Sequence, residues 1–176
     1  MTDGRNGQRT LVLLRHAKAE QPREALDAER PLTVRGHADA AAAGAWLARH
    51  ELLPDVVLCS PARRTRQTWH GVAMGMTGSP AEGGPAGSTP AVRYEPTAYE
   101  AHPDELLELV RTVDPAAGTV LLIAHNPGIS LLSALLDPER ADPDGLRTTD
   151  IVVHRPVSAW PALTHAPLAT RHTARS

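Results

Sequence analysis

Short, uninterrupted runs of hydrophobic residues recur along the chain, and polar residues follow each run. The clearest runs occupy residues 10–14, 56–59 and 120–124. Apolar runs of this length, without an apolar/polar alternation, are typical of strands that are buried on both faces of a sheet. Residues 91–94 and 151–153 predict two further strands.

Helix signals lie between these runs. Thr33 predicts the N-cap of a helix over residues 34–50, and Ser60 followed by Pro61 predicts a helix that continues to about residue 73. Two more helices are predicted over residues 103–113 and 128–136. Because strands and helices alternate, the predicted fold is a three-layer α/β/α sandwich with a mostly parallel central sheet.

The chain length fits one domain, which we place at residues 10–164. We expect a flexible N-terminal tail over residues 1–9 and a C-terminal tail over residues 165–176. The segment 75–90 contains five glycines and three prolines, which predicts a surface loop.

Composition and charge argue against some classes of binding partner. The chain has 18 Lys and Arg residues against 20 Asp and Glu residues, so its net charge is -2 and a nucleic-acid partner is not expected. We expect no membrane association, because no apolar run approaches the roughly 20 residues of a spanning helix. Cys59 is the only cysteine and the N-terminus is polar, which favours a cytoplasmic protein.

Candidate chemistry gathers where the predicted parallel strands end, which is where such sheets bind ligands. Arg15 and His16 follow the first run, the segment 60–64 follows the second, and His125 follows the third. Arginine suits a phosphate because its planar guanidinium donates two parallel hydrogen bonds. A neutral histidine can attack phosphorus when its other ring nitrogen is held by a hydrogen bond.

Four segments in order resemble the histidine phosphatase (phosphoglycerate mutase-like) superfamily, and within it the SixA-like phosphohistidine phosphatase branch. They read LRHAKA at 14–19, RPLTVRG at 30–36, SPARRTRQT at 60–68 and IAHNPG at 123–128. The last segment departs from the family pattern, since Ala124 replaces the usual glycine.

The resemblance implies a phosphoglycerate mutase-like fold and a metal-independent, cofactor-free phosphatase. By position, His16 is the nucleophile that forms a phosphohistidine, and Arg15, Arg64 and His125 hold the phosphate. Arg64 rather than Arg63 lies four residues after Ser60, as the family pattern requires. The implied substrate is protein phosphohistidine, and oxyanions such as phosphate or vanadate should inhibit. Attack by neutral imidazole also predicts that activity falls as His16 becomes protonated.

The general acid is the open point of this interpretation. Larger members of the family place a glutamate after the third strand, and Glu100 is our first choice here, with Asp104 second. The SixA-like branch often lacks an acid, and a phosphohistidine needs one less than a phosphate ester does.

Three alternatives stand beside this interpretation. The first is a small-molecule phosphomonoesterase of the same family that acts on a sugar or nucleotide phosphate. The second, of another class, is a non-catalytic phosphate-binding regulatory module. A cysteine phosphatase is disfavoured, because the loop from Cys59 to Arg64 is one residue short and Pro61 removes a backbone donor.

Overall fold

A central sheet of six strands organises the computed structural model, which describes residues 8–77 and 89–176. The strand order is β3-β2-β4-β1-β5-β6. The first four strands in this order pair in parallel, whereas β5 runs antiparallel to β1 and β6 runs antiparallel to β5. The strands are β1 (Thr10–Arg15), β2 (Val56–Cys59), β3 (Ala91–Tyr94), β4 (Thr119–Ala124), β5 (Asp150–His154) and β6 (Leu168–Thr173).

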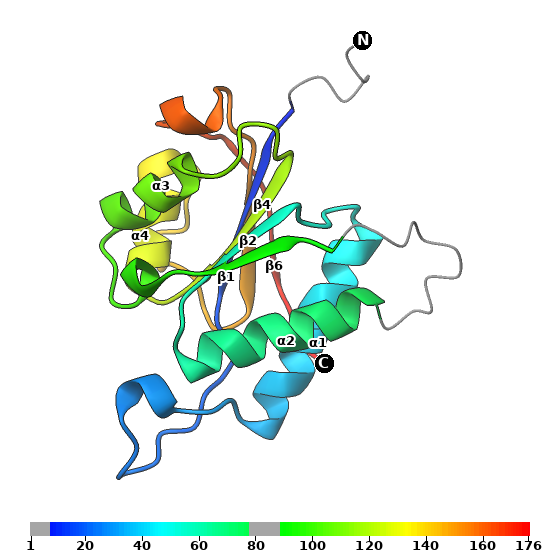
Figure 1. Cartoon of the computed structure of the whole chain (residues 1–176), viewed down its shortest axis with the longest axis vertical. Coiled ribbons are helices and arrows are strands. Elements are labelled where there is room, and N and C mark those ends of the chain that lie inside the picture. The colour runs from blue at the N-terminus through cyan, green and yellow to red at the C-terminus, as the bar shows by residue number, and fades with distance from the viewer. Residues whose placement is uncertain (1–7, 78–88) are drawn as a thin grey trace.

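Helices cover both faces of this sheet, so the predicted three-layer α/β/α architecture is confirmed (Figure 1). One layer consists of α1 (Val34–Arg49) and α2 (Arg63–Thr77), and the other of α3 (Pro103–Arg111) and α4 (Gly128–Leu136). Three short 3-10 helices complete the fold: η1 (Asp27–Glu29), η2 (Pro96–Ala98) and η3 (Trp160–Ala162).

Successive residues of each central strand point to opposite faces and fill two separate cores. In β1, Leu11 and Leu13 pack with the core beneath α3 and α4, whereas Val12 and Leu14 pack with the core beneath α1 and α2. All four side chains are fully buried. Burial on both sides explains why these strands are continuously hydrophobic in the sequence.

Glycines let α1 and α2 approach each other closely. A Cβ atom on Gly44 would lie 2.0 Å from the backbone oxygen of Val72, and one on Gly75 would lie 2.0 Å from that of Ala41. Both distances are far shorter than real contacts, so neither glycine can gain a side chain unless the helices separate. The close pairing fixes α2, whose first turn enters the candidate site.

Two boundary predictions were wrong. Residues 168–173 do not form a tail but the edge strand β6, which pairs with β5. The helix after Ser60 begins at Arg63 and extends to Thr77, so residues 75–77 of the predicted loop are helical. Residues 1–7 of the predicted N-terminal tail and residues 78–88 of the predicted loop lie outside the described residues.

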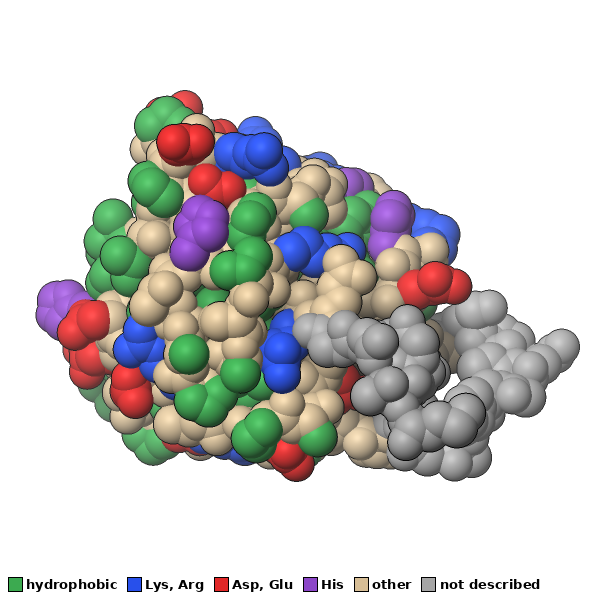
Figure 2. All heavy atoms as spheres, turned by 90° about the horizontal axis from the view of Figure 1, so that it is seen from above, with side chains coloured by type: hydrophobic (Ala, Val, Ile, Leu, Met, Phe, Trp, Pro, Cys, Tyr) green, Lys and Arg blue, Asp and Glu red, His purple; other side chains and the backbone are tan. Residues whose placement is uncertain are grey.

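Among residues 8–77 and 89–176, no helix combines the length and apolar character needed to cross a membrane. The same residues contain no cluster of three or more His, Cys, Asp or Glu side chains that could hold a metal ion. On the end of the molecule where β1 begins, Lys and Arg side chains are scattered among hydrophobic and acidic ones rather than gathered into a patch (Figure 2).

Candidate active site

The parallel register brings the ends of β1, β2 and β4 to the same level. Arg15 pairs with Ala124, and Cys59 pairs with Ile123, so the residues that follow leave the sheet side by side. Those residues are His16, Ser60 and His125. The site lies at the end of the sheet opposite the start of β1, beside η1, in the lower part of Figure 1.

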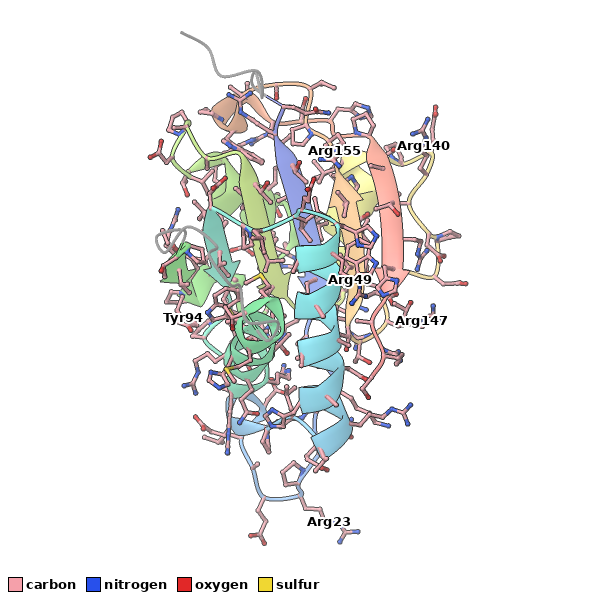
Figure 3. The ribbon with its side chains drawn as sticks, turned by 90° about the vertical axis from the view of Figure 1, so that its right-hand side faces the viewer. Arg23, Arg49, Tyr94, Arg140, Arg147 and Arg155 are labelled. Atoms are coloured by element: carbon pink, nitrogen blue, oxygen red, sulfur yellow. The ribbon has the colours of Figure 1, made fainter. Side chains whose placement is uncertain are left out.

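After β1 the chain forms a long loop that extends away from the sheet before it returns to begin α1. Figure 3 shows Arg23 at the tip of this loop, pointing away from the body of the molecule, with Arg155 at the far end of the sheet. Side chains of α2 hold the loop: Thr68 Oγ1 accepts from the backbone N–H of Ala17 at 3.0 Å, and Gln67 Oε1 accepts from Leu32 at 2.8 Å. The loop and α2 therefore form one unit around His16.

His16 is buried and its ring is fixed. Its Nδ1 lies 2.8 Å from the carbonyl oxygen of Ala17. Because a carbonyl oxygen only accepts, Nδ1 must carry the proton, which leaves a lone pair on Nε2. Burial lowers the pKa of His16 to about 4, and the nearby charges of Arg15, Arg64 and Arg30 also lower it. The ring is therefore neutral at pH 7, as a nucleophile must be.

His125 lies beside His16, with 5.3 Å between the ring centroids. Its Nε2 is 2.7 Å from the hydroxyl oxygen of Ser60. Burial, followed by the neighbouring His16, lowers the pKa of His125 to about 3. Its Nδ1 is buried and has no hydrogen-bond partner in the described part of the chain.

Arg64 and Arg15 bring positive charge to the same place. Arg64 is only 6% exposed, and its terminal nitrogens donate to Asp27, at 2.7 Å to the backbone oxygen and 3.1 Å to Oδ2. Arg15 donates from Nη1 to the carbonyl oxygen of Leu146 at 3.1 Å. In both arginines the Nε atom is buried and lacks a hydrogen-bond partner among the described residues.

These unpartnered atoms point to an anionic ligand. A buried polar group without a partner costs about 1–3 kcal/mol, and more when it is charged. Arg15, Arg64 and His125 each have one such unpartnered nitrogen, and the three residues are neighbours in space. An oxyanion that accepts several hydrogen bonds fits this arrangement. A tetrahedral phosphoryl group has this property.

The structure brings together four of the five predicted catalytic residues: Arg15, His16, Arg64 and His125. Glu100 is not among them. It is exposed, has a φ of 57°, and makes no hydrogen bond or ion pair with any residue that the structure describes. Asp104, the second choice for the acid, is exposed at the start of α3 and likewise has no such contact there. Arg63 is exposed on the outer side of α2.

Sequence reasoning missed two residues that contact the site. Asp27, in η1, accepts hydrogen bonds from Arg64, Arg30 and the hydroxyl of Tyr99. The Tyr99 ring also lies edge-on to His125 at 5.6 Å. The only available signal for Asp27 was its place three residues before the RPLT segment.

Cys59 is buried in the core at the end of β2, and its Sγ donates to the carbonyl oxygen of Ser60. Burial raises the pKa of its thiol to about 12. A thiol in this state is not a nucleophile at neutral pH, in agreement with the structural role expected from the sequence.

Comparisons with known proteins point to one family. The profile of the histidine phosphatase superfamily (branch 1) matches residues 11–82. An uncharacterized protein of Mycobacterium tuberculosis is 37% identical over 123 residues, which are 70% of this chain and 69% of that protein.

Two solved structures share the fold. One, from Nakamurella multipartitia, carries the provisional name phosphohistidine phosphatase SixA; it is 33% identical, covers 96% of this chain and 97% of its own, and gives a TM-score of 0.78. The other is the protein histidine phosphatase SixA in complex with tungstate, at 22% identity and a TM-score of 0.68, covering 93% of this chain and 96% of its own.

Proposed function

The chain belongs to branch 1 of the histidine phosphatase superfamily and is a phosphatase, and from this premise we propose that it hydrolyses protein phosphohistidine through a phosphohistidine on His16. One observation carries the proposal. The neutral His16, with its Nε2 lone pair, adjoins three residues whose buried nitrogens lack partners in the described part of the chain.

Binding comes first. The phosphoryl oxygens of the substrate accept hydrogen bonds from Arg15, Arg64 and His125, which replace the partners that these groups lack. Positive charge from the two arginines spreads over the oxygens, and this stabilises the transferring group more in the transition state than in the substrate. The site needs no metal ion for this task.

Transfer then occurs in two steps. The Nε2 lone pair of His16 forms a bond to phosphorus while the bond to the leaving group breaks, and the leaving group takes that electron pair. Water then attacks the phosphohistidine, the N–P bond breaks, and its electron pair returns to Nε2. The products are inorganic phosphate, the dephosphorylated substrate and unchanged His16. The Nδ1 hydrogen bond to Ala17 keeps the ring in one orientation throughout.

Two features support a protein substrate over a small molecule. The chain is similar to the Nakamurella multipartitia protein named for phosphohistidine hydrolysis across nearly its whole length. The residues at the mouth of the site are also open, since the Asp27 side chain is 50% exposed. A histidine side chain on the surface of a protein can reach such a site. A phosphomonoesterase for small molecules is the competing function.

The test is a trapping experiment. The protein is incubated with acetyl phosphate or p-nitrophenyl phosphate, quenched in alkali, and mapped for acid-labile phosphate by mass spectrometry. His16→Ala is the test variant and Cys59→Ser the matched control. We expect a label on His16 in the wild type and in Cys59→Ser, and none in His16→Ala. Turnover of a phosphohistidine protein is then compared with turnover of sugar and nucleotide phosphates.

Each outcome separates the candidates. Labelling with faster turnover of phosphohistidine supports the proposal. Labelling with faster turnover of a sugar or nucleotide phosphate supports the small-molecule enzyme. Vanadate binding without label or turnover would contradict the proposed mechanism.

A further inference from the structure

The carboxylate of Asp27 is crowded with donors yet remains open. Its Oδ1 accepts from Arg30 at 3.1 Å, and its Oδ2 accepts from Arg64 at 3.1 Å and from the Tyr99 hydroxyl at 2.5 Å. A carboxylate offers about four lone-pair positions, so one remains on Oδ1. Half of the side chain is exposed to solvent. Asp27 can therefore accept one more hydrogen bond from a group that arrives from outside.

This carboxylate is an acceptor and not an acid. The Tyr99 hydroxyl, Arg30 and Arg64 all donate to it and hold its pKa well below the usual range for an aspartate. The hydrogen bond to Asp27 in turn raises the pKa of Tyr99, so the hydroxyl keeps its proton. Asp27 is therefore ionised at neutral pH.

Asp27 lies at the rim of the phosphoryl site. His16, Arg64 and His125 form the buried floor, each less than a tenth exposed. A phosphoryl group that rests on this floor keeps its leaving group on the solvent side, where Asp27 is. Arg64 belongs to both the buried floor and the rim of the site. Its terminal nitrogens donate to Asp27, while its buried Nε has no partner in the described residues.

The Asp27 carboxylate can distinguish two kinds of leaving group. In phosphohistidine the imidazole nitrogen that does not carry phosphorus can bear a proton. When the P–N bond breaks, its electron pair stays on the departing nitrogen, and a ring that bears this proton departs as neutral imidazole. A phosphate ester departs as an oxyanion. An ionised carboxylate at the rim can accept a hydrogen bond from the protonated ring, whereas an oxyanion has no proton to donate to it.

We infer that Asp27 is a specificity-determining residue, which accepts a hydrogen bond from the protonated, non-phosphorylated nitrogen of the leaving imidazole ring and so selects phosphohistidine over phosphate esters. The inference rests on the proposed function. It also explains how the site can act without a protein acid, since the substrate brings the required proton to the site and Asp27 stabilises it there.

The experiment measures kcat/KM for a phosphohistidine-containing protein and for p-nitrophenyl phosphate, whose leaving group is an anion. Asp27→Asn keeps the size of the side chain but removes its charge. Damage to the phosphoryl floor lowers both rates equally and cancels in their ratio. We expect the ratio of phosphohistidine to ester turnover to fall at least about tenfold, the value of one charge-assisted hydrogen bond. Arg15→Lys is the control, because Arg15 donates to the carbonyl oxygen of Leu146 and not to Asp27; both rates should fall and the ratio should be kept.

A pH profile gives a second reading. Because Asp27 favours the protonated imidazole ring in the bound substrate, kcat for phosphohistidine should fall at a lower alkaline pH in Asp27→Asn than in the wild type. An unchanged ratio together with an unchanged profile would overturn the role of Asp27 and leave the proposed function standing. A wild type that hydrolyses the ester but not phosphohistidine would instead overturn the proposed substrate, and the role of Asp27 with it.

Discussion

His16 donates its Nδ1 proton to the carbonyl oxygen of Ala17 across 2.8 Å. The contact is between neighbours in the sequence, so it forms as soon as the chain leaves β1 in this conformation. It decides which nitrogen of the ring is free. The loop that carries Ala17 is held in turn by Thr68 of α2, so the orientation of the ring depends on the packing of that helix.

The first prediction concerns the protonation of His16. Burial lowers its pKa to about 4, so the ring should stay neutral as the pH falls from 7 to 5 and become protonated only near pH 4. The decline of activity expected from the ordinary histidine pKa near 6.5 therefore moves to lower pH. NMR titration of the ring signals measures this directly, with His16→Gln to assign the resonance. A midpoint between pH 6 and 7 would contradict it.

The second prediction is that the protein loses stability in mild acid. His16 and His125 have pKa values of about 4 and about 3 when folded, whereas an unfolded histidine has about 6.5. Below pH 6.5 the unfolded state takes up protons that the folded state does not, so the free energy of unfolding falls as the pH drops from 6.5 to 4. Each residue can account for up to roughly 3 kcal/mol over this range.

Urea unfolding at pH 7.5, 6 and 5 tests this dependence. The double variant His16→Gln, His125→Gln should show a shallower loss of stability than the wild type. Some loss will remain, because burial also lowers the pKa of His154. Equal slopes for the variant and the wild type would show that neither site histidine is responsible.

The third prediction separates two adjacent arginines. Arg64 is buried beside the site and Arg63 is exposed, so only Arg64→Ala should weaken the binding of vanadate. Loss of a charge-assisted hydrogen bond costs about 1.5–3 kcal/mol, or roughly ten- to a hundredfold in affinity. Isothermal titration with vanadate gives the affinities, and Arg63→Ala is the matched control. A similar loss in both variants would mean that the general charge of this helix turn matters rather than the Arg64 position.

Much of this site could be predicted because its residues follow buried parallel strands. The runs that became β1, β2 and β4 are hydrophobic on both faces, and such strands leave a strong signal in the sequence. Their carboxyl ends must meet at one edge of a parallel sheet, which brings His16 and His125 together without further information. The choice of Arg64 over Arg63 came from the family pattern, in which the arginine lies four residues after Ser60.

Other parts of the fold and the site have no comparable hydrophobic pattern in the sequence. Strand β6 reads LATRHT and pairs on one side only, so its polar residues resemble a tail. Asp27 and Tyr99 belong to separate loops, 72 residues apart, and only the tertiary structure brings their side chains together. Loop residues have no period from which a direction can be predicted.

The fourth prediction concerns Glu100. It is exposed and has no hydrogen bond or ion pair within the described residues, so Glu100→Gln should change kcat/KM for p-nitrophenyl phosphate by less than about threefold. General acid catalysis contributes about 10²–10⁴-fold where it operates, so the assay separates the two cases clearly. Asp104→Asn serves as the parallel measurement. A hundredfold fall in Glu100→Gln would restore this residue as the acid, which would require the segment around Tyr99 to close over bound substrate.

The last prediction tests how the contact between α1 and α2 supports the site. A Cβ at residue 44 would lie 2.0 Å from the backbone oxygen of Val72, and a backbone atom cannot move aside as a side chain can. Gly44→Ala should therefore force the helices apart and lower the free energy of unfolding by about 1–3 kcal/mol, despite the better helix propensity of alanine. Thermal unfolding measures the effect. The control is Gly118→Ala, where the closest atom to a Cβ is the flexible end of Asp55, at 3.2 Å.

Because α2 carries both Arg64 and the Thr68 hydroxyl that holds the loop of His16, Gly44→Ala should also raise the vanadate dissociation constant at a temperature where the variant is still folded. Loss of stability with unchanged vanadate affinity would show that the first turn of α2 keeps its place independently of the helix contact.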